Sequence, residues 1–149
     1  MKRARFSEDG FAGGAEALLF GMLIFVAGTL LVAHAWSVVE TKLAADAAAR
    51  EAARSYVGAP DAQTAWVDAQ QAAAQAIAGY GRDPTQARVR LAAGRWGRCQ
   101  RVTIAVSVPA PLLSLPFVGR IGEAETVHAD HSELVEPYTT GPAGTATCG

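Results

Sequence analysis

The sequence predicts an α+β protein in which a long N-terminal helix and a second helix precede a small antiparallel sheet of about three strands. An uncharged apolar stretch covers residues 17–39, and residues 40–57 are strong helix formers without Pro or Gly. From residue 87 onward the hydrophobic pattern changes from a helical period to a period of two. The length of 149 residues leaves room for one modest domain and an anchor.

The apolar stretch ALLFGMLIFVAGTLLVAHAWSVV contains no Asp, Glu, Lys or Arg. A helix of this length rises about 34 Å, which exceeds the roughly 30 Å of a bilayer's hydrocarbon core. Because no other segment is apolar enough to surround such a helix, we expect lipid to surround it. The chain then divides into a cytoplasmic N-terminal tail or leader (1–16), a transmembrane segment (17–39), an extracytoplasmic domain (40–136) and a Gly/Thr-rich tail (137–149).

Positive charges are balanced on the two sides of this segment and do not predict its orientation. The very short N-terminal tail, the larger downstream region and its cysteines favour an N-terminus inside and a domain outside. A secretory signal peptide is the alternative, because Ala33-His34-Ala35 has the A-x-A form of a cleavage site. Cleavage after Ala35 would release a soluble domain, and the sequence leaves this alternative open.

Small residues lie on one face of the apolar segment. Gly21 and Gly28 are seven residues apart, and Ala17 precedes Gly21 by four. This spacing lets a second apolar helix approach closely. Glycine is also common in membrane helices without any partner, so both interpretations stay open.

Helical character continues to about residue 57, where Gly58-Ala59-Pro60 interrupts it. Asp46 and Arg50 on the outer face are spaced for an ion pair. Asp61 is the expected N-cap of a second helix that stops at Gly79-Tyr80-Gly81. The opposite face of the first helix is expected to pack closely against a flat partner; it carries Thr41, Ala44, Ala45, Ala48, Ala52 and Tyr56.

Two alternating runs follow and predict a β-hairpin with one buried face. Ala87, Val89 and Leu91 supply the buried positions of its first strand, and residues 102–108 supply those of the second. The segment 109–122 reads as a partly apolar loop, and residues 123–135 read as a third strand.

The sequence contains no catalytic motif: no phosphate-binding loop, nucleophile elbow or helical H-E-x-x-H pair is present. One group of potential metal ligands occurs, at His128, Asp130, His131 and Glu133, but strand alternation points the two histidines to opposite faces. We therefore expect no enzyme, no metal and no cofactor. The formal net charge of -1 also argues against a nucleic-acid partner.

Two cysteines, Cys99 and Cys148, match no metal-binding pattern and can form at most one intramolecular disulfide. In an oxidising compartment we expect them to pair, which would tie the C-terminal tail to the sheet. Two free thiols are the alternative.

The segment DGFAGGAEALLFGMLIFVAG, leading into a helix that is first apolar and then amphipathic, resembles the TadE-like family of minor pilins and pseudopilins of tight-adherence (Tad or Flp) pilus systems. The resemblance is clearest over residues 10–57. It implies a type IV pilin-like architecture and a structural role in assembling a Tad-type pilus or related secretion apparatus. Other pilin-like subunits, the assembly machinery and a prepilin peptidase are the implied partners.

In that family the peptidase cleaves after a glycine on the cytoplasmic side, and an acidic residue is normally fifth in the mature chain. The resemblance places processing between Gly10 and Phe11 and gives Glu16 an assembly role, although Glu16 would then be sixth. A second hypothesis is an extracytoplasmic binding module, either anchored or released after Ala35, in which the segment 109–122 contacts a ligand.

Overall fold

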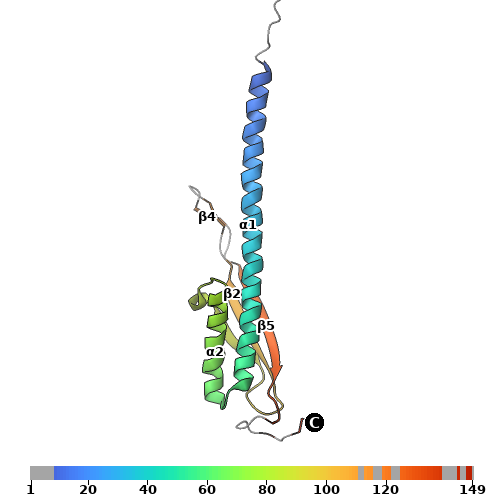
Figure 1. The fold of residues 1–149 in the computed structure, drawn as a ribbon, viewed down its shortest axis with the longest axis vertical. Helices are drawn as coiled ribbons and strands as arrows, with labels where there is room; N and C mark the ends of the chain where they lie inside the picture. Colours follow the sequence, from blue (N-terminus) through green and yellow to red (C-terminus); the bar gives the residue numbers. More distant parts are fainter. Residues whose placement is uncertain are drawn as a thin grey trace, which may run out of the picture. The chain divides into compact units, whose positions relative to one another are not determined.

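The computed structural model confirms the α+β fold, with a long N-terminal helix, a second helix and a three-stranded antiparallel sheet (Figure 1). Two units make up the chain, Met1–Trp36 and Ser37–Gly149, and each is described by itself. The structure describes residues 9–110, 113–115, 119–121, 125–138, 144, 147 and 148. The elements are helix α1 (Asp9–Gly58), helix α2 (Ala62–Gly79), the 3-10 turn η1 (Pro84–Gln86) and strands β1 (Arg88–Ala93), β2 (Arg101–Pro109), β3 (Leu113–Leu115), β4 (Gly119–Ile121) and β5 (Thr126–Leu134).

The second unit is built on a sheet with the order β1-β2-β5, in which both pairs are antiparallel. In β2, residues 102, 104, 106 and 108 are buried in the core as expected, and Ala105, which alternation places on the opposite face, is buried as well. That core also contains Ile77 of α2 and Tyr56 of α1, so both helices cover the same face of the sheet (Figure 1). The other face carries polar side chains. This one-sided burial is typical of an antiparallel sheet with one solvated face.

The small-residue face predicted for the first helix forms the centre of this core. Its alanines are fully buried, and Ala49 and Ala53 extend the face beyond the predicted set. Because alanine ends at Cβ, the helix backbone lies close to its neighbours. Tyr56 and Trp66 of α2 meet edge to face, with ring centroids 6.5 Å apart, which closes the end of the interface between the two helices.

Helix α2 begins where the sequence predicts. The carboxylate of Asp61 accepts hydrogen bonds from the backbone N–H groups of Gln63 and Thr64, both at 2.9 Å. These bonds satisfy two of the donors that every helix N-terminus leaves unpaired, which explains why the helix starts here.

Three details differ from the sequence predictions. Asp46 pairs with Lys42 at 3.0 Å instead of with Arg50, because Lys42 also donates to the His128 carbonyl oxygen at 2.7 Å and is thereby held beside β5. The segment 109–122 contains the antiparallel pair β3–β4, which is too short to produce a readable alternation. Leu91 is exposed, since β1 lies at the sheet edge and contributes only Val89 to the border of the core.

Candidate membrane-insertion and assembly surface

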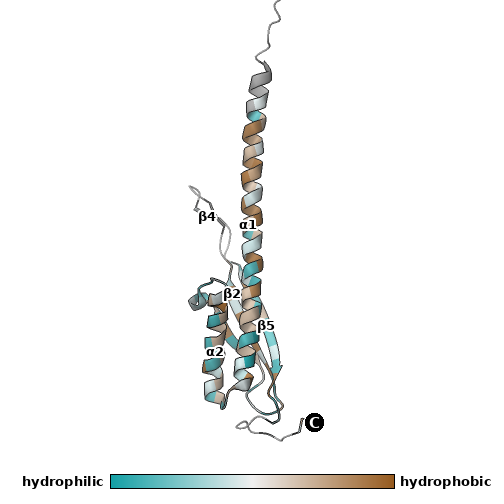
Figure 2. Cartoon of the chain, in the orientation of Figure 1, coloured by the Kyte–Doolittle hydropathy of each residue, from teal (hydrophilic) through white to brown (hydrophobic). Residues whose placement is uncertain are grey.

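The first unit presents an apolar helical surface. In the part of the chain that the structure describes, α1 is the one helix long and apolar enough to span a membrane by its length and composition. The most apolar stretch of α1 buries none of its residues in the protein. Leu18 and Phe25 are 77% and 73% exposed, and apolar residues succeed one another along this part of α1 in Figure 2. A continuous apolar surface of this kind needs lipid or protein to cover it.

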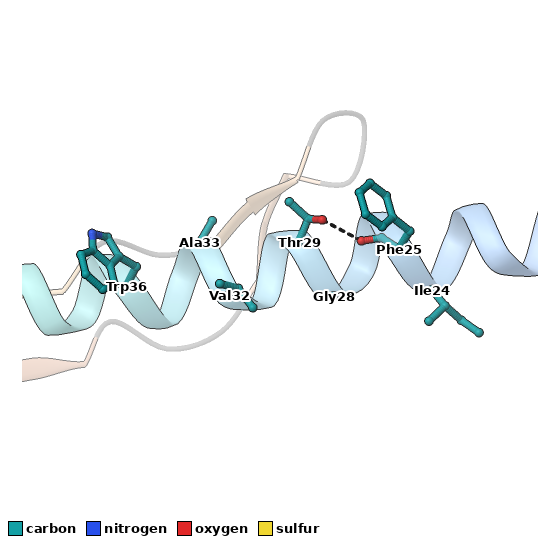
Figure 3. Close-up of a pocket in the computed structure, with 7 residues that line it drawn as sticks. All are labelled: Ile24, Phe25, Gly28, Thr29, Val32, Ala33 and Trp36. Carbon is teal, nitrogen blue, oxygen red and sulfur yellow. Dashed lines mark hydrogen bonds between the residues drawn. The ribbon is translucent and has the colours of Figure 1, made fainter.

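The backbone of this segment is suited to an apolar environment, because a helix pairs its own N–H and C=O groups. Thr29, the hydroxyl residue in its middle, donates from Oγ1 to the Phe25 carbonyl oxygen at 2.8 Å (Figure 3). The hydroxyl group is thus satisfied within the helix and does not oppose burial in lipid.

The glycines of this segment face open space. A Cβ atom added at Gly21 or Gly28 would meet no atom within 4 Å. Packing within the described part of the chain therefore does not require glycine at either position. Around Gly28 the surface is hollowed into a shallow apolar groove (Figure 3). The other residues that line it are Ile24, Phe25, Thr29, Val32, Ala33 and Trp36. Such a groove is suited to a second apolar helix or to an acyl chain.

The residues that the family resemblance links to processing and assembly lie in the N-terminal part of α1. Gly10 and Phe11 belong to its first turn, and Glu16 is exposed farther along the helix, next to the exposed Ala17. Because α1 begins at Asp9, Glu16 lies beyond the first turn, where stabilisation of an anion by the helix dipole has fallen off. The helix dipole therefore does not explain how the charge of the Glu16 carboxylate is stabilised at the edge of the apolar segment.

Cys99 and Cys148 form a disulfide, with their Cα atoms 5.3 Å apart, as the sequence predicts for an oxidising compartment. The bond joins positions 49 residues apart, so it removes about 4 kcal/mol of loop entropy from the unfolded chain in the entropy model. It attaches the end of the chain to the connection before β2. The backbone N–H of Cys99 also donates to the Val135 carbonyl oxygen at 2.9 Å. Most of the predicted tail at 137–149 lies outside the described residues.

Sequence reasoning missed one polar cluster near the start of the second unit. The Arg82 guanidinium donates from one nitrogen to the carbonyl and hydroxyl oxygens of Ser37, both at 3.0 Å. The same nitrogen lies 3.6 Å from a carboxylate oxygen of Glu40. The cluster attaches α1 to the turn after α2. No local pattern could have revealed it, because its residues are 45 positions apart.

The histidines of β5 have separate partners. His128 Nδ1 lies 2.9 Å from the Ser107 hydroxyl oxygen, whereas His131 Nε2 lies 3.0 Å from a Glu133 carboxylate oxygen. They point to opposite faces of the strand, as the alternation predicts. Within the described ranges, no three His, Cys, Asp or Glu side chains converge as a metal site would require.

Comparison of the chain with family models, with curated proteins and with solved structures finds no match.

Proposed function

We propose that the chain is a membrane-anchored minor pilin or pseudopilin, a structural and assembly component of a Tad-type pilus or a related secretion apparatus. One observation supports this function most directly: α1 is a single helix whose first part exposes apolar side chains and whose later part builds the core of a small α+β unit. A helix of this design serves as an anchor before assembly and as a packing element after it. The N-terminus lies in the cytoplasm and the folded unit outside.

Glu16 supplies the chemistry of assembly in this proposal. A carboxylate at the edge of a membrane segment is costly unless it is solvated or paired. Cleavage between Gly10 and Phe11 by a prepilin peptidase would create a positively charged α-amino group on each mature subunit. That ammonium group is a complementary partner for Glu16 of a neighbouring subunit, and the groove at Gly28 gives the neighbour's apolar helix room to approach.

Replacing Glu16 with alanine tests this role in the native host. We expect the variant to insert in the membrane as the wild type does and to abolish pilus assembly. Glu51→Ala is the matched control, because Glu51 is an exposed acid of the same helix whose contact with Arg54 is long, at 3.9 Å. The control should assemble normally. Normal piliation by the Glu16→Ala strain would contradict the proposed role.

A second candidate function is a secreted or anchored binding module. The second unit begins at Ser37, so cleavage after Ala35 would remove the apolar segment and leave that unit whole. Mass spectrometry of the mature N-terminus, on protein from its own host, separates the possibilities. A chain that begins at Phe11 supports the pilin function, one that begins at Trp36 supports secretion, and an intact Met1 supports a permanent anchor.

A further inference from the structure

The solvated face of the three-stranded sheet carries a groove that the proposed pilus function does not use. It crosses all three strands and has a volume of about 560 Å³. Its lining is rich in hydrogen-bonding side chains and contains no Phe, Tyr or Trp; its one aromatic ring is the imidazole of His128. The lining residues are Gln86, Arg88, Arg90, Ser107, Pro109, Thr126 and His128.

Strand register explains why these side chains meet. Arg88 pairs with Ser107, and Ser107 pairs with His128, so the three form one row across the sheet. Arg90 lies two residues farther along β1 on the same face, about 7 Å from Arg88 along the strand. Thr126 continues the groove at the end of β5. The sequence disperses these residues over 41 positions, and only the antiparallel pairing brings them together.

The groove is positively charged and its two arginines are available to a ligand. Both are exposed, and the ion pairs among the described residues involve Lys42, Arg54, Arg82 and His131 instead. The nearest acidic side chain of this face in the strand register is Asp130, which is separated from Arg90 by Ala105. Two guanidinium groups that have no ion pair among the described residues therefore lie on the same face as the hydroxyl groups of Ser107 and Thr126. Guanidinium groups bind carboxylate or phosphate oxygens in bidentate fashion.

We propose that this groove binds an anionic polysaccharide, with Arg88 and Arg90 contacting its acidic groups and Ser107 and Thr126 contacting its sugar hydroxyls. Hydroxyl side chains both donate and accept hydrogen bonds, as sugar hydroxyls do. Single-stranded nucleic acid is disfavoured because its binding sites stack successive bases on several aromatic side chains, whereas this lining contains a single imidazole, that of His128. Anionic lipid surfaces attract larger basic clusters of about four to eight residues. The groove lies in the second unit, and the proposed ligand does not depend on the pilus function proposed above.

Binding is measured with the full chain in neutral phosphatidylcholine nanodiscs, using alginate oligosaccharides as the probe and neutral dextran as the reference. We expect the wild type to bind alginate at least ten-fold more tightly than dextran. The double variant Arg88→Gln and Arg90→Gln should lose at least ten-fold in affinity for alginate. The matched control, Arg50→Gln and Arg54→Gln, removes the same charge from exposed positions of α1 and should change the affinity less than two-fold.

Equal losses in the two double variants would overturn the proposal, because they would indicate attraction by net charge alone. Equal binding of alginate and dextran would also overturn it. Single-stranded DNA or phosphatidylglycerol vesicles bound more tightly than alginate at the same ionic strength would replace the polysaccharide as the ligand. Near-UV circular dichroism verifies folding of each variant, and the single variants Arg90→Gln and Arg50→Gln provide the same comparison if a double variant unfolds.

Discussion

Replacing Arg82 with methionine tests how the second unit holds its portion of α1. Methionine keeps an unbranched apolar stem and removes the guanidinium group, which donates two hydrogen bonds of 3.0 Å to Ser37. Hydrogen bonds from a charged donor contribute about 1.5–3 kcal/mol. The contact with Glu40, at 3.6 Å and half-exposed, adds less than about 1 kcal/mol. We therefore expect the free energy of unfolding to fall by about 2–3 kcal/mol.

The assay is a denaturant titration of the full chain in detergent, followed by near-UV circular dichroism, which reports the packing of aromatic side chains. Arg54→Met is the matched control. Arg54 lies 3.9 Å from Glu51, and its side chain is 66% exposed, so the control should lose less than about 0.5 kcal/mol.

Two results would refute this reasoning about Arg82. An unfolding free energy within about 0.5 kcal/mol of the wild type would mean that water replaces the guanidinium at no cost. An equal loss in Arg54→Met would mean that the effect comes from the positive charge and not from the hydrogen bonds to Ser37.

Three further substitutions test the core, a turn and a helix cap. Ala48→Leu should lower the free energy of unfolding by about 1–3 kcal/mol, because Ala48 is fully buried and the larger side chain has no room. The control Ala78→Leu, at an exposed position of α2, should change the free energy of unfolding by less than about 0.5 kcal/mol. Equal effects of the two substitutions would contradict close packing around Ala48. Gly94→Ala should lower the free energy of unfolding by at least about 1 kcal/mol in the same titration, since φ of Gly94 is 81° and a Cβ atom would collide with the Arg101 carbonyl oxygen. An unchanged denaturant midpoint would refute this expectation. The backbone N–H of Thr64 lowers the pKa of Asp61, so the stabilisation from this cap is present above about pH 4 and lost as the pH falls through the lowered pKa. Asp61→Ala should therefore lower Tm at pH 7, and the difference should shrink below about pH 4; a constant difference would contradict the charged cap.

Local patterns in the chain were sufficient to predict each main element. The apolar stretch at 17–39, the capping carboxylate of Asp61 and the alternation of residues 102–108 all depend on neighbours within a few positions. Side-chain period and capping chemistry act at that range. The pair β3–β4 was missed because each of its strands has only 3 residues, too few for an alternation.

Some of the candidate sites could be proposed from the sequence, and other contacts could not. Gly10, Phe11 and Glu16 were proposed as sites because one contiguous segment resembles a pilin-like family, and the pairing of Cys99 with Cys148 followed because the chain has only two cysteines. By contrast, the partner of Asp46 depends on a hydrogen bond between Lys42 and β5. Such a contact joins residues 86 positions apart, and nothing near Asp46 in the sequence indicates it.

The sequence by itself determined that this protein has a long helix whose first part is apolar, because composition and periodicity alone specify which surfaces avoid water. Only the tertiary structure decided that Arg82 holds α1 at Ser37 and that Arg88, Ser107 and His128 form one row across the sheet. For Arg82 the physical reason is that its partner lies 45 positions away in the chain. For the row across the sheet it is strand register: a shift of one residue in the pairing would send Ser107 or His128 to the opposite face, and the sequence does not state which residues stand opposite one another.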